Sequence, residues 1–124
     1  MLFEGLEFPA EAQVPNLGED NVFRFCTFKA LEETQTTIIE SDFLNCTFSG
    51  CDFYWSSIPV VLFYECRFEN CTFRGVSFGD CTLVKCTFMD CVFTASNLGG
   101  GCSFDGTKWF ECCQIRCRGL EGLW

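Results

Sequence analysis

The sequence predicts an all-β solenoid in which about twenty residues make one square coil. A Cys-x-Phe phrase recurs from Cys46 to Phe93, and a large apolar residue occupies every fifth position. A period of five fits neither the turn of a helix, about 3.6 residues, nor the repeat of a flat strand, about 2 residues. The chain must therefore turn a corner every five residues. Four sides close one coil, and successive coils stack by strand pairing at about 4.8 Å.

The central position of each five-residue unit is apolar over twelve consecutive units, with no slip in register. The position two residues earlier is small and is most often Cys. The central residues are Phe43, Phe48, Phe53, Ile58, Phe63, Phe68, Phe73, Phe78, Leu83, Phe88, Phe93 and Leu98.

This pattern resembles the pentapeptide repeat proteins, whose unit has a small residue, a polar residue, a central Leu or Phe and two variable residues. The resemblance implies a right-handed quadrilateral parallel β-helix in which the central residue and the residue two before it point inward. The sequence departs from the family by using mostly Cys where Ala is usual. We interpret this as a size-compatible substitution.

The chain divides into an N-terminal segment, the repeat array and a C-terminal tail. Residues 1–20 are acidic, contain Pro9 and Pro15 and lack the repeat, so we expect them to cover the first coil. The β-helix is predicted over 21–109, since Phe23 and Phe28 already fit its register. Residues 110–124 carry several apolar side chains, and this tail must cap the last coil or meet another chain.

Two irregularities interrupt the array. Glu33 falls on a central position, where an unpaired carboxylate would carry a large free-energy cost. We therefore expect residues 29–37 to bulge outward or to form a short helical detour, as a functional loop or as a tolerated insertion. The run of glycines at 99–101 adds one residue, after which Cys102 and Phe104 resume the pattern one position late.

The twelve cysteines raise the question of disulfides or metal. Cysteines twenty residues apart would stack in one inward column and point the same way, which is poor disulfide geometry. The chain has no histidine and no paired Cys-x-x-Cys to close a zinc site. We predict reduced thiols that act as small apolar filler, with no cofactor and no metal. The loosely spaced Cys112, Cys113 and Cys117 are the remaining candidate ligands.

No catalytic constellation assembles from the sequence, so we expect no enzymatic activity. Histidine, the commonest proton carrier near neutral pH, is absent. Burial of inward thiols would raise their pKa and make them inert, which leaves only Cys113 or Cys117 as a residual nucleophile. The chain opens with no basic leader followed by an apolar core, and no apolar run approaches about 20 residues. We expect a cytoplasmic protein with no membrane partner.

The net charge of −9 is concentrated in one half of the chain. Residues 1–65 contain eleven acidic and two basic residues, whereas 66–124 contain six of each. On a twenty-residue coil, Asp20, Glu40 and Asp80 fall in one outward corner column, which is interrupted by Val60. Asp42 stands beside Glu40, and Glu32 stacks over Asp52 in another column. This stripe either keeps the protein soluble or binds a basic partner. Its residues are Asp20, Glu32, Glu40, Asp42, Asp52 and Asp80.

A second surface feature is apolar. Leu44, Tyr64 and Val84 are twenty residues apart and fall in one outward column. Tyr54 and Trp55 point outward on another face, and Trp124 lies in the tail. Contiguous exposed apolar surface usually marks an interface, although single apolar residues are common on protein surfaces. The candidate partner or dimer residues are Leu44, Tyr54, Trp55, Tyr64, Val84 and Trp124.

The family resemblance implies a function for the acidic stripe. Several pentapeptide repeat proteins look like B-form DNA in width and charge and protect DNA gyrase by occupying its DNA site. An acidic mimic competes for the Lys/Arg surface that DNA neutralises, and it repels nucleic acid itself. We therefore predict a non-enzymatic, acidic DNA-mimic inhibitor of a DNA-binding protein or complex.

The length of the array favours one class of target. About four to five coils at roughly 4.8 Å each make a rod near 20 Å, whereas the gyrase-protecting members look longer. The chain is similar in size and charge to small phage-encoded anti-CRISPR proteins, so we expect a CRISPR surveillance complex in a bacterial host cell as the target. The alternatives are gyrase protection, with quinolone or toxin resistance, and a structural scaffold that dimerises through Tyr64 and the C-terminal tail.

Overall fold

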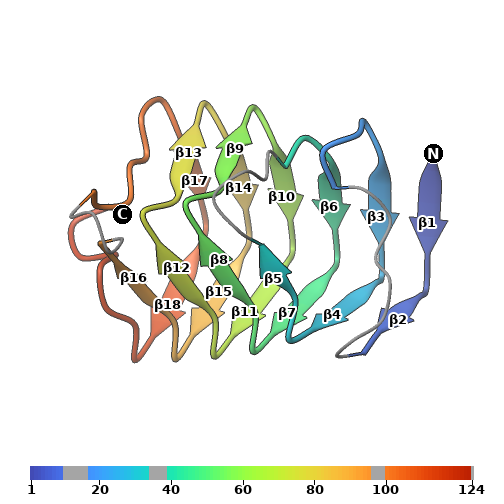
Figure 1. Cartoon of the computed structure of the whole chain (residues 1–124), viewed down its shortest axis with the longest axis horizontal. Coiled ribbons are helices and arrows are strands. Elements are labelled where there is room, and N and C mark those ends of the chain that lie inside the picture. The colour runs from blue at the N-terminus through green and yellow to red at the C-terminus, as the bar shows by residue number, and fades with distance from the viewer. Residues whose placement is uncertain (10–16, 34–38, 96–99, 124) are drawn as a thin grey trace.

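The computed structural model describes residues 1–9, 17–33, 39–95 and 100–123, except for the side chains of Glu32 and Glu33. In these ranges the chain forms eighteen short strands and no helix. The strands wind around one long axis, with β1 at one end of the rod and the C-terminal strands at the other (Figure 1). None of the described segments is a helix that is long and apolar enough to cross a membrane.

The strands stack into four parallel sheets, one on each side of the coil. Sheet 1 contains β1 (Leu2–Glu4), β3 (Val22–Arg24), β6 (Asp42–Leu44), β10 (Leu62–Tyr64), β14 (Thr82–Val84) and β17 (Lys108–Phe110). Sheet 2 contains β2 (Glu7–Phe8), β4 (Thr27–Lys29), β7 (Thr47–Ser49), β11 (Arg67–Glu69), β15 (Thr87–Met89) and β18 (Cys113–Ile115). Sheet 3 contains β5 (Glu32–Glu33), β8 (Asp52–Tyr54), β12 (Thr72–Arg74) and β16 (Val92–Thr94), and sheet 4 contains β9 (Ser57–Pro59) and β13 (Ser77–Gly79).

The register confirms the predicted solenoid. Phe43 pairs with Phe63, and Phe48 pairs with Phe68, so neighbouring strands in a sheet are twenty residues apart. Because side chains alternate along a strand, the central residue of each three-residue strand points into the rod and its two neighbours point outward. The central residues of the three-residue strands from β3 to β16 are almost completely buried, whereas those of the end strands β1, β17 and β18 are half-buried.

The core is built from columns of stacked phenylalanine rings. The ring of Phe68 lies between those of Phe48 and Phe88, with centroid distances of 4.8 and 4.7 Å. It also makes an edge contact with Phe63 on the neighbouring side of the coil, at 5.6 Å. Stacked and edge-to-face arrangements are both favourable for aromatic pairs. The columns therefore hold each coil to the next while the edge contacts join the four sides.

Most corners of the described coils lie in the left-handed backbone region, but the residues at the corner positions 20 and 40 do not. Non-glycine corner residues in this region have φ between 52° and 56°, and their N–H groups donate to a carbonyl of the next coil, as from Val60 to Gly79 at 2.7 Å. Gly, Asn and Asp adopt this conformation most readily. Val60 is a β-branched residue there, with 74% of its surface exposed, and its conformation is correspondingly costly.

Replacing the strained valine should stabilise the protein. We expect Val60→Asn to raise the free energy of unfolding by about 0.5–1.5 kcal/mol, because Asn tolerates positive φ and little buried surface is lost. Urea unfolding under reducing conditions measures this change. The matched reverse variant is Asn70→Val, at a corner with φ of 53° and the same type of hydrogen bond, to Met89 O. A Val60→Asn protein no more stable than wild type would contradict this account of the corners.

The N-terminal residues already belong to the coil. Strands β1 and β2 pair with β3 and β4 in the twenty-residue register, and the ring of Phe3 stacks on that of Phe23 at 5.0 Å. The expectation that residues 1–20 lack the repeat is therefore wrong for residues 2–8. The signal was present in the sequence, since Phe3 and Phe8 lie twenty residues before Phe23 and Phe28.

The predicted detour at 29–37 is also corrected in part. Strand β4 extends to Lys29, and β5 pairs Glu32 with Asp52 and Glu33 with Phe53. The backbone thus keeps the coil register through Glu33, with strand pairing in place of the expected helix or bulge. Residues 34–38 lie outside the described residues, as do the side chains of the two glutamates.

The last coil continues the sheets after a larger insertion than predicted. Thr82 pairs with Lys108 and Thr87 with Cys113, a spacing of twenty-six residues. Six residues are therefore inserted before Cys102, rather than one; a five-residue period cannot distinguish these two cases. Leu98, predicted as a central residue, lies outside the described residues.

The C-terminal tail covers the end of the rod. Strand β18 places Gln114 at a central position, and its side-chain amide donates to Leu120 O at 3.3 Å. Leu120 is completely buried. Gly119 has φ of 91°, and a Cβ there would lie 2.1 Å from Phe93 O, so only glycine permits this approach. The described tail thus caps the last coil, and residues 110–115, assigned to the tail from sequence, form part of that coil.

Candidate protein-binding surfaces

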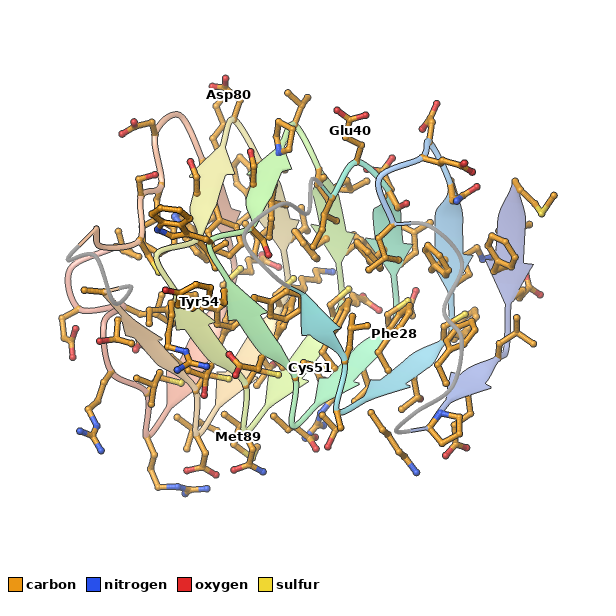
Figure 2. All side chains as sticks on the ribbon, in the orientation of Figure 1. Phe28, Glu40, Cys51, Tyr54, Asp80 and Met89 are labelled. Carbon is orange, nitrogen blue, oxygen red and sulfur yellow. The ribbon has the colours of Figure 1, made fainter. Side chains whose placement is uncertain are left out.

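The most acidic part of the surface is a corner of the coil between sheets 4 and 1. Asp20, Glu40 and Asp80 occupy positions of this corner column, with Val60 between Glu40 and Asp80, and all three acids are exposed; we call these three residues the acidic edge. Figure 2 shows Glu40 and Asp80 projecting from the same edge of the rod. Asp80 has the regular corner conformation, and its N–H donates to Asp105 O at 2.8 Å. Asp20 and Glu40 do not have this conformation, and Glu40 N donates to Leu17 O at 2.8 Å. The strands that follow the three residues belong to sheet 1, which sets the level of each residue along the rod.

The carboxylates of the acidic edge are not neutralised within the chain. Five acidic residues form salt bridges with Arg or Lys, and all five lie away from this edge. Across the described part of the chain, which includes every Lys and Arg, no basic side chain lies within salt-bridge distance of the edge. The five paired acids are Glu4, Glu7, Asp52, Glu69 and Asp90. Within the described chain no Lys or Arg therefore balances the charge of this edge.

Asp42 and Asp52, two other residues of the predicted stripe, have internal partners. Asp42 Oδ1 accepts a hydrogen bond from Leu62 N at 2.9 Å. Asp52 Oδ2 lies 2.5 Å from Arg74 Nη2, and the guanidinium group stacks over the Tyr54 ring. Both carboxylates contact the next coil, and the charge of Asp52 is balanced by Arg74. The backbone of Glu32 pairs with Asp52, as the spacing predicted, but its side chain lies outside the described residues.

Two further acidic residues lie next to the acidic edge. Glu19 precedes Asp20 in the chain and is exposed. Asp105 is also exposed, and its carbonyl oxygen accepts the hydrogen bond of Asp80 N. The sequence could have indicated Glu19 by its position beside Asp20. Asp105 could not be placed there because the six-residue insertion hides its register.

The apolar residues predicted at the surface fall into two groups. Leu44, Tyr64 and Val84 lie in one outward column of sheet 1, which continues to Phe110. Leu62 stands beside Tyr64 on the same strand. We call the outward side of sheet 1, with these five residues, the apolar face. It borders the acidic edge, because the corner residues at 20, 40 and 80 immediately precede strands of sheet 1.

The second apolar group lies on sheet 3. The rings of Tyr54 and Trp55 are 6.3 Å apart, and Arg74 covers the tyrosine. Tyr54 therefore already has a cation–π partner within the chain. Trp124 lies outside the described residues.

The inward cysteines do more than fill space. In each case the thiol donates a weak hydrogen bond to a carbonyl of the preceding coil, as from Cys46 to Phe23 O at 3.2 Å and from Cys91 to Phe68 O at 3.2 Å. All twelve thiols are free. Cys112 and Cys117 continue this inward arrangement, whereas Cys113 points outward and is exposed. The described residues contain no cluster of three or more His, Cys, Asp or Glu suited to a metal.

Burial of the Cys46 thiol makes stability sensitive to alkaline pH. Desolvation raises the pKa of Cys46 to about 11, while an unfolded thiol ionises near about 8.5. Between these values the unfolded chain has lost a proton that the folded protein keeps, so stability is full below about pH 8.5 and falls as pH rises. We expect the free energy of unfolding to decline from pH 9 to 10.5 and to decline less in Cys46→Ala. Stability that stays constant over this range would contradict the prediction.

Comparison with known proteins agrees with this architecture. Residues 60–97 match a family model described as pentapeptide repeats (9 copies). No curated protein matches the chain. Proteins with this fold are generally structural or bind other proteins. The stack of parallel strands extends beyond the matched residues on both sides, from Leu2 to Ile115, with a spacing of twenty-six residues in the last coil. Residues 60–97 are thus similar to pentapeptide repeats, and the coils that adjoin them continue the same sheets.

Proposed function

We propose that the protein is a non-enzymatic inhibitor that mimics DNA and occupies the DNA site of a DNA-binding protein or complex. The observation that supports this most is the acidic edge, whose carboxylates are exposed and have no basic partner within the chain. Five of the eight basic residues are already paired with acids elsewhere. Such a distribution favours a basic partner and disfavours direct binding of nucleic acid.

The charge density of the rod is of the right order for this role. Sheet 1 has six strands, so the rod is about 24 Å long at about 4.8 Å per step. A net charge of −9 over that length is about 0.4 charges per Å, compared with about 0.6 per Å for duplex DNA. To the DNA-binding surface of a target, the rod therefore presents a negative electrostatic field comparable to that of DNA. This field extends over a short length only.

The short length bears on the target. A rod of about 24 Å covers about seven base pairs at about 3.4 Å each. Such a mimic suits a DNA-binding channel that can be blocked locally, and we propose a CRISPR surveillance complex as the target, with the protein acting as an anti-CRISPR inhibitor. A DNA gyrase subunit is the competing target within the same mechanism.

Affinity capture tests this proposal and separates the two targets. The purified protein is immobilised, exposed to a bacterial lysate that contains both a CRISPR effector and gyrase, and eluted with a salt gradient. We expect a DNA-binding protein to elute as salt rises, because charges at the surface are screened over about 10 Å at 0.1 M salt. A Cas subunit would support the anti-CRISPR role, and a gyrase subunit would support gyrase protection.

Two results would contradict the proposal. One is capture of proteins that have no DNA site, and the other is a complex whose affinity is unchanged between 0.05 and 0.5 M salt. A salt-insensitive complex would indicate binding through apolar surface, which is the prediction of a structural scaffold.

A further inference from the structure

The apolar face is framed by two corner columns of different charge. On the side toward sheet 4, the corners of four successive strands are occupied by acids except at Val60. On the side toward sheet 2, the corners of the same strands carry Phe25, Asn45, Glu65 and Lys85. Each strand of sheet 1 therefore has one corner residue at each of its ends, and β14 lies between Asp80 and Lys85.

From β3 to β14 the acids of the two columns never occur on the same level of the rod. The first column is acidic at β3, β6 and β14, where Asp20, Glu40 and Asp80 stand. At β10 the first column has Val60, and the second column has Glu65. Only at β17 do acids stand at both ends of a strand, Asp105 before Gly106 and Glu111 after the strand. From β3 to β14 the alternation is complementary to itself if the two columns are brought together level by level.

We propose that the apolar face binds a second copy of this chain, with the two rods side by side and related by a two-fold axis parallel to the rod. This operation keeps each level in place and exchanges the two corner columns. Asp80 of each copy then faces Lys85 of the other, and Val60 faces Glu65. Across the described residues neither Asp80 nor Lys85 has an ion-pair partner within the chain, and both are exposed.

The opposite arrangement of the rods is disfavoured by charge. A two-fold axis perpendicular to the rod would reverse the order of the levels and would place the first column against itself. Asp20 would then face Asp80 of the second copy, and this contact would occur twice by symmetry. Like charges brought together at an interface are unfavourable and suppress wrong pairings. The sequence of charges therefore selects the parallel arrangement.

The centre of the face supplies apolar contact in the same arrangement. Leu62 and Tyr64 are outward neighbours on β10, half-buried in the single chain, and the two-fold axis places each against the other in the second copy. The arrangement also accounts for Val60, whose strained and highly exposed side chain avoids placing an acid opposite Glu65. Six strands of three residues each make a face of about 24 Å by about 10 Å. This is smaller than a standard interface of about 800 Å² per partner, so we expect a weak dimer with a Kd on the order of micromolar or above.

Charge-swap variants test the proposed dimer. The self-association of the wild-type protein, Asp80→Lys, Lys85→Asp and the double variant is measured by sedimentation equilibrium between 5 and 500 µM in 50 mM salt. Each single change creates two like-charge contacts per dimer, so we expect about tenfold or greater weakening for each. The double variant restores opposite charges, and we expect its Kd to return to within about threefold of the wild-type value.

Asp80→Lys carries its own control for net charge. It reduces the net charge of the chain from −9 to −7, so general repulsion alone would make the variant associate more strongly. The proposal predicts the reverse. Circular dichroism and thermal unfolding check that each variant is folded.

Three results would overturn the proposal: a wild-type protein that remains monomeric at 500 µM, a double variant no better than the single variants, or stronger association of Asp80→Lys. This inference goes beyond the proposed inhibitor function, and its failure would leave the capture experiment unaffected.

Discussion

The triple variant Asp20→Lys, Glu40→Lys, Asp80→Lys should lose binding to the DNA-binding target while it keeps the fold of the wild-type protein. The three side chains are exposed corner residues, and no basic residue of the described chain pairs with them. Reversal of the three charges makes the electrostatic interaction at the proposed contact repulsive. In many protein complexes, truncation of a single interfacial charge already weakens binding substantially. Calorimetric titration of the captured target measures the affinity, and we expect at least a hundredfold loss.

A variant with the same change of net charge on another surface provides the control. Glu7, Glu69 and Asp90 lie on or beside sheet 2 and are each paired with a basic residue. Exposed ion pairs contribute only about 0–1 kcal/mol each, so reversing these three acids should leave the protein folded. We expect it to bind the target within about tenfold of wild type. Equal loss in both triple variants would mean that net charge alone acts, and full binding by the corner variant would refute the acidic edge as the contact.

Phe68→Ala should destabilise the protein by about 3–5 kcal/mol, the range for deleting a buried aromatic side chain. Phe68 is 2% exposed and stacks on both Phe48 and Phe88. Its loss leaves a cavity in one column and removes contacts to the coils before and after it. Urea unfolding at pH 7 with reductant measures the effect.

Phe25→Ala is the matched control for the core variant. Phe25 lies at a corner with φ of 53° and is 56% exposed. Substitutions at exposed positions usually change stability by less than about 0.5 kcal/mol. If Phe68→Ala and Phe25→Ala had similar effects, the stacked columns would not be the main source of stability.

Much of the fold could be predicted from sequence because the repeat imposes the same demand on every coil. A side chain that points into the rod must recur every fifth residue, so Phe43 to Phe93 define the register without any alignment. The same argument extends to Phe3 and Phe8, whose place in the coil was missed because the segment after them lacks the pattern. The sequence predicts one inserted residue before Cys102, whereas the structure has six. Both insertions bring the chain to the same position of the five-residue unit, so the repeat cannot distinguish them.

The candidate site was predicted less completely, for a different physical reason. The register places a side chain on an outward column, and this was sufficient for Asp20, Glu40 and Asp80. It does not determine what the side chain contacts. Asp52 lies 2.5 Å from Arg74, twenty-two residues away, and Asp42 accepts a backbone hydrogen bond from Leu62. Such pairs depend on rotamers and on the exact spacing of coils, which the repeat does not encode.

The most direct test of the account is competition between this protein and DNA for the same target. A short fluorescent DNA duplex is bound to the captured DNA-binding protein, and the inhibitor is added in increasing amounts. We predict complete release of the duplex at saturation, with no ternary complex, and no release by the Asp20→Lys, Glu40→Lys, Asp80→Lys variant. A stable complex that contains target, DNA and inhibitor together would contradict the account.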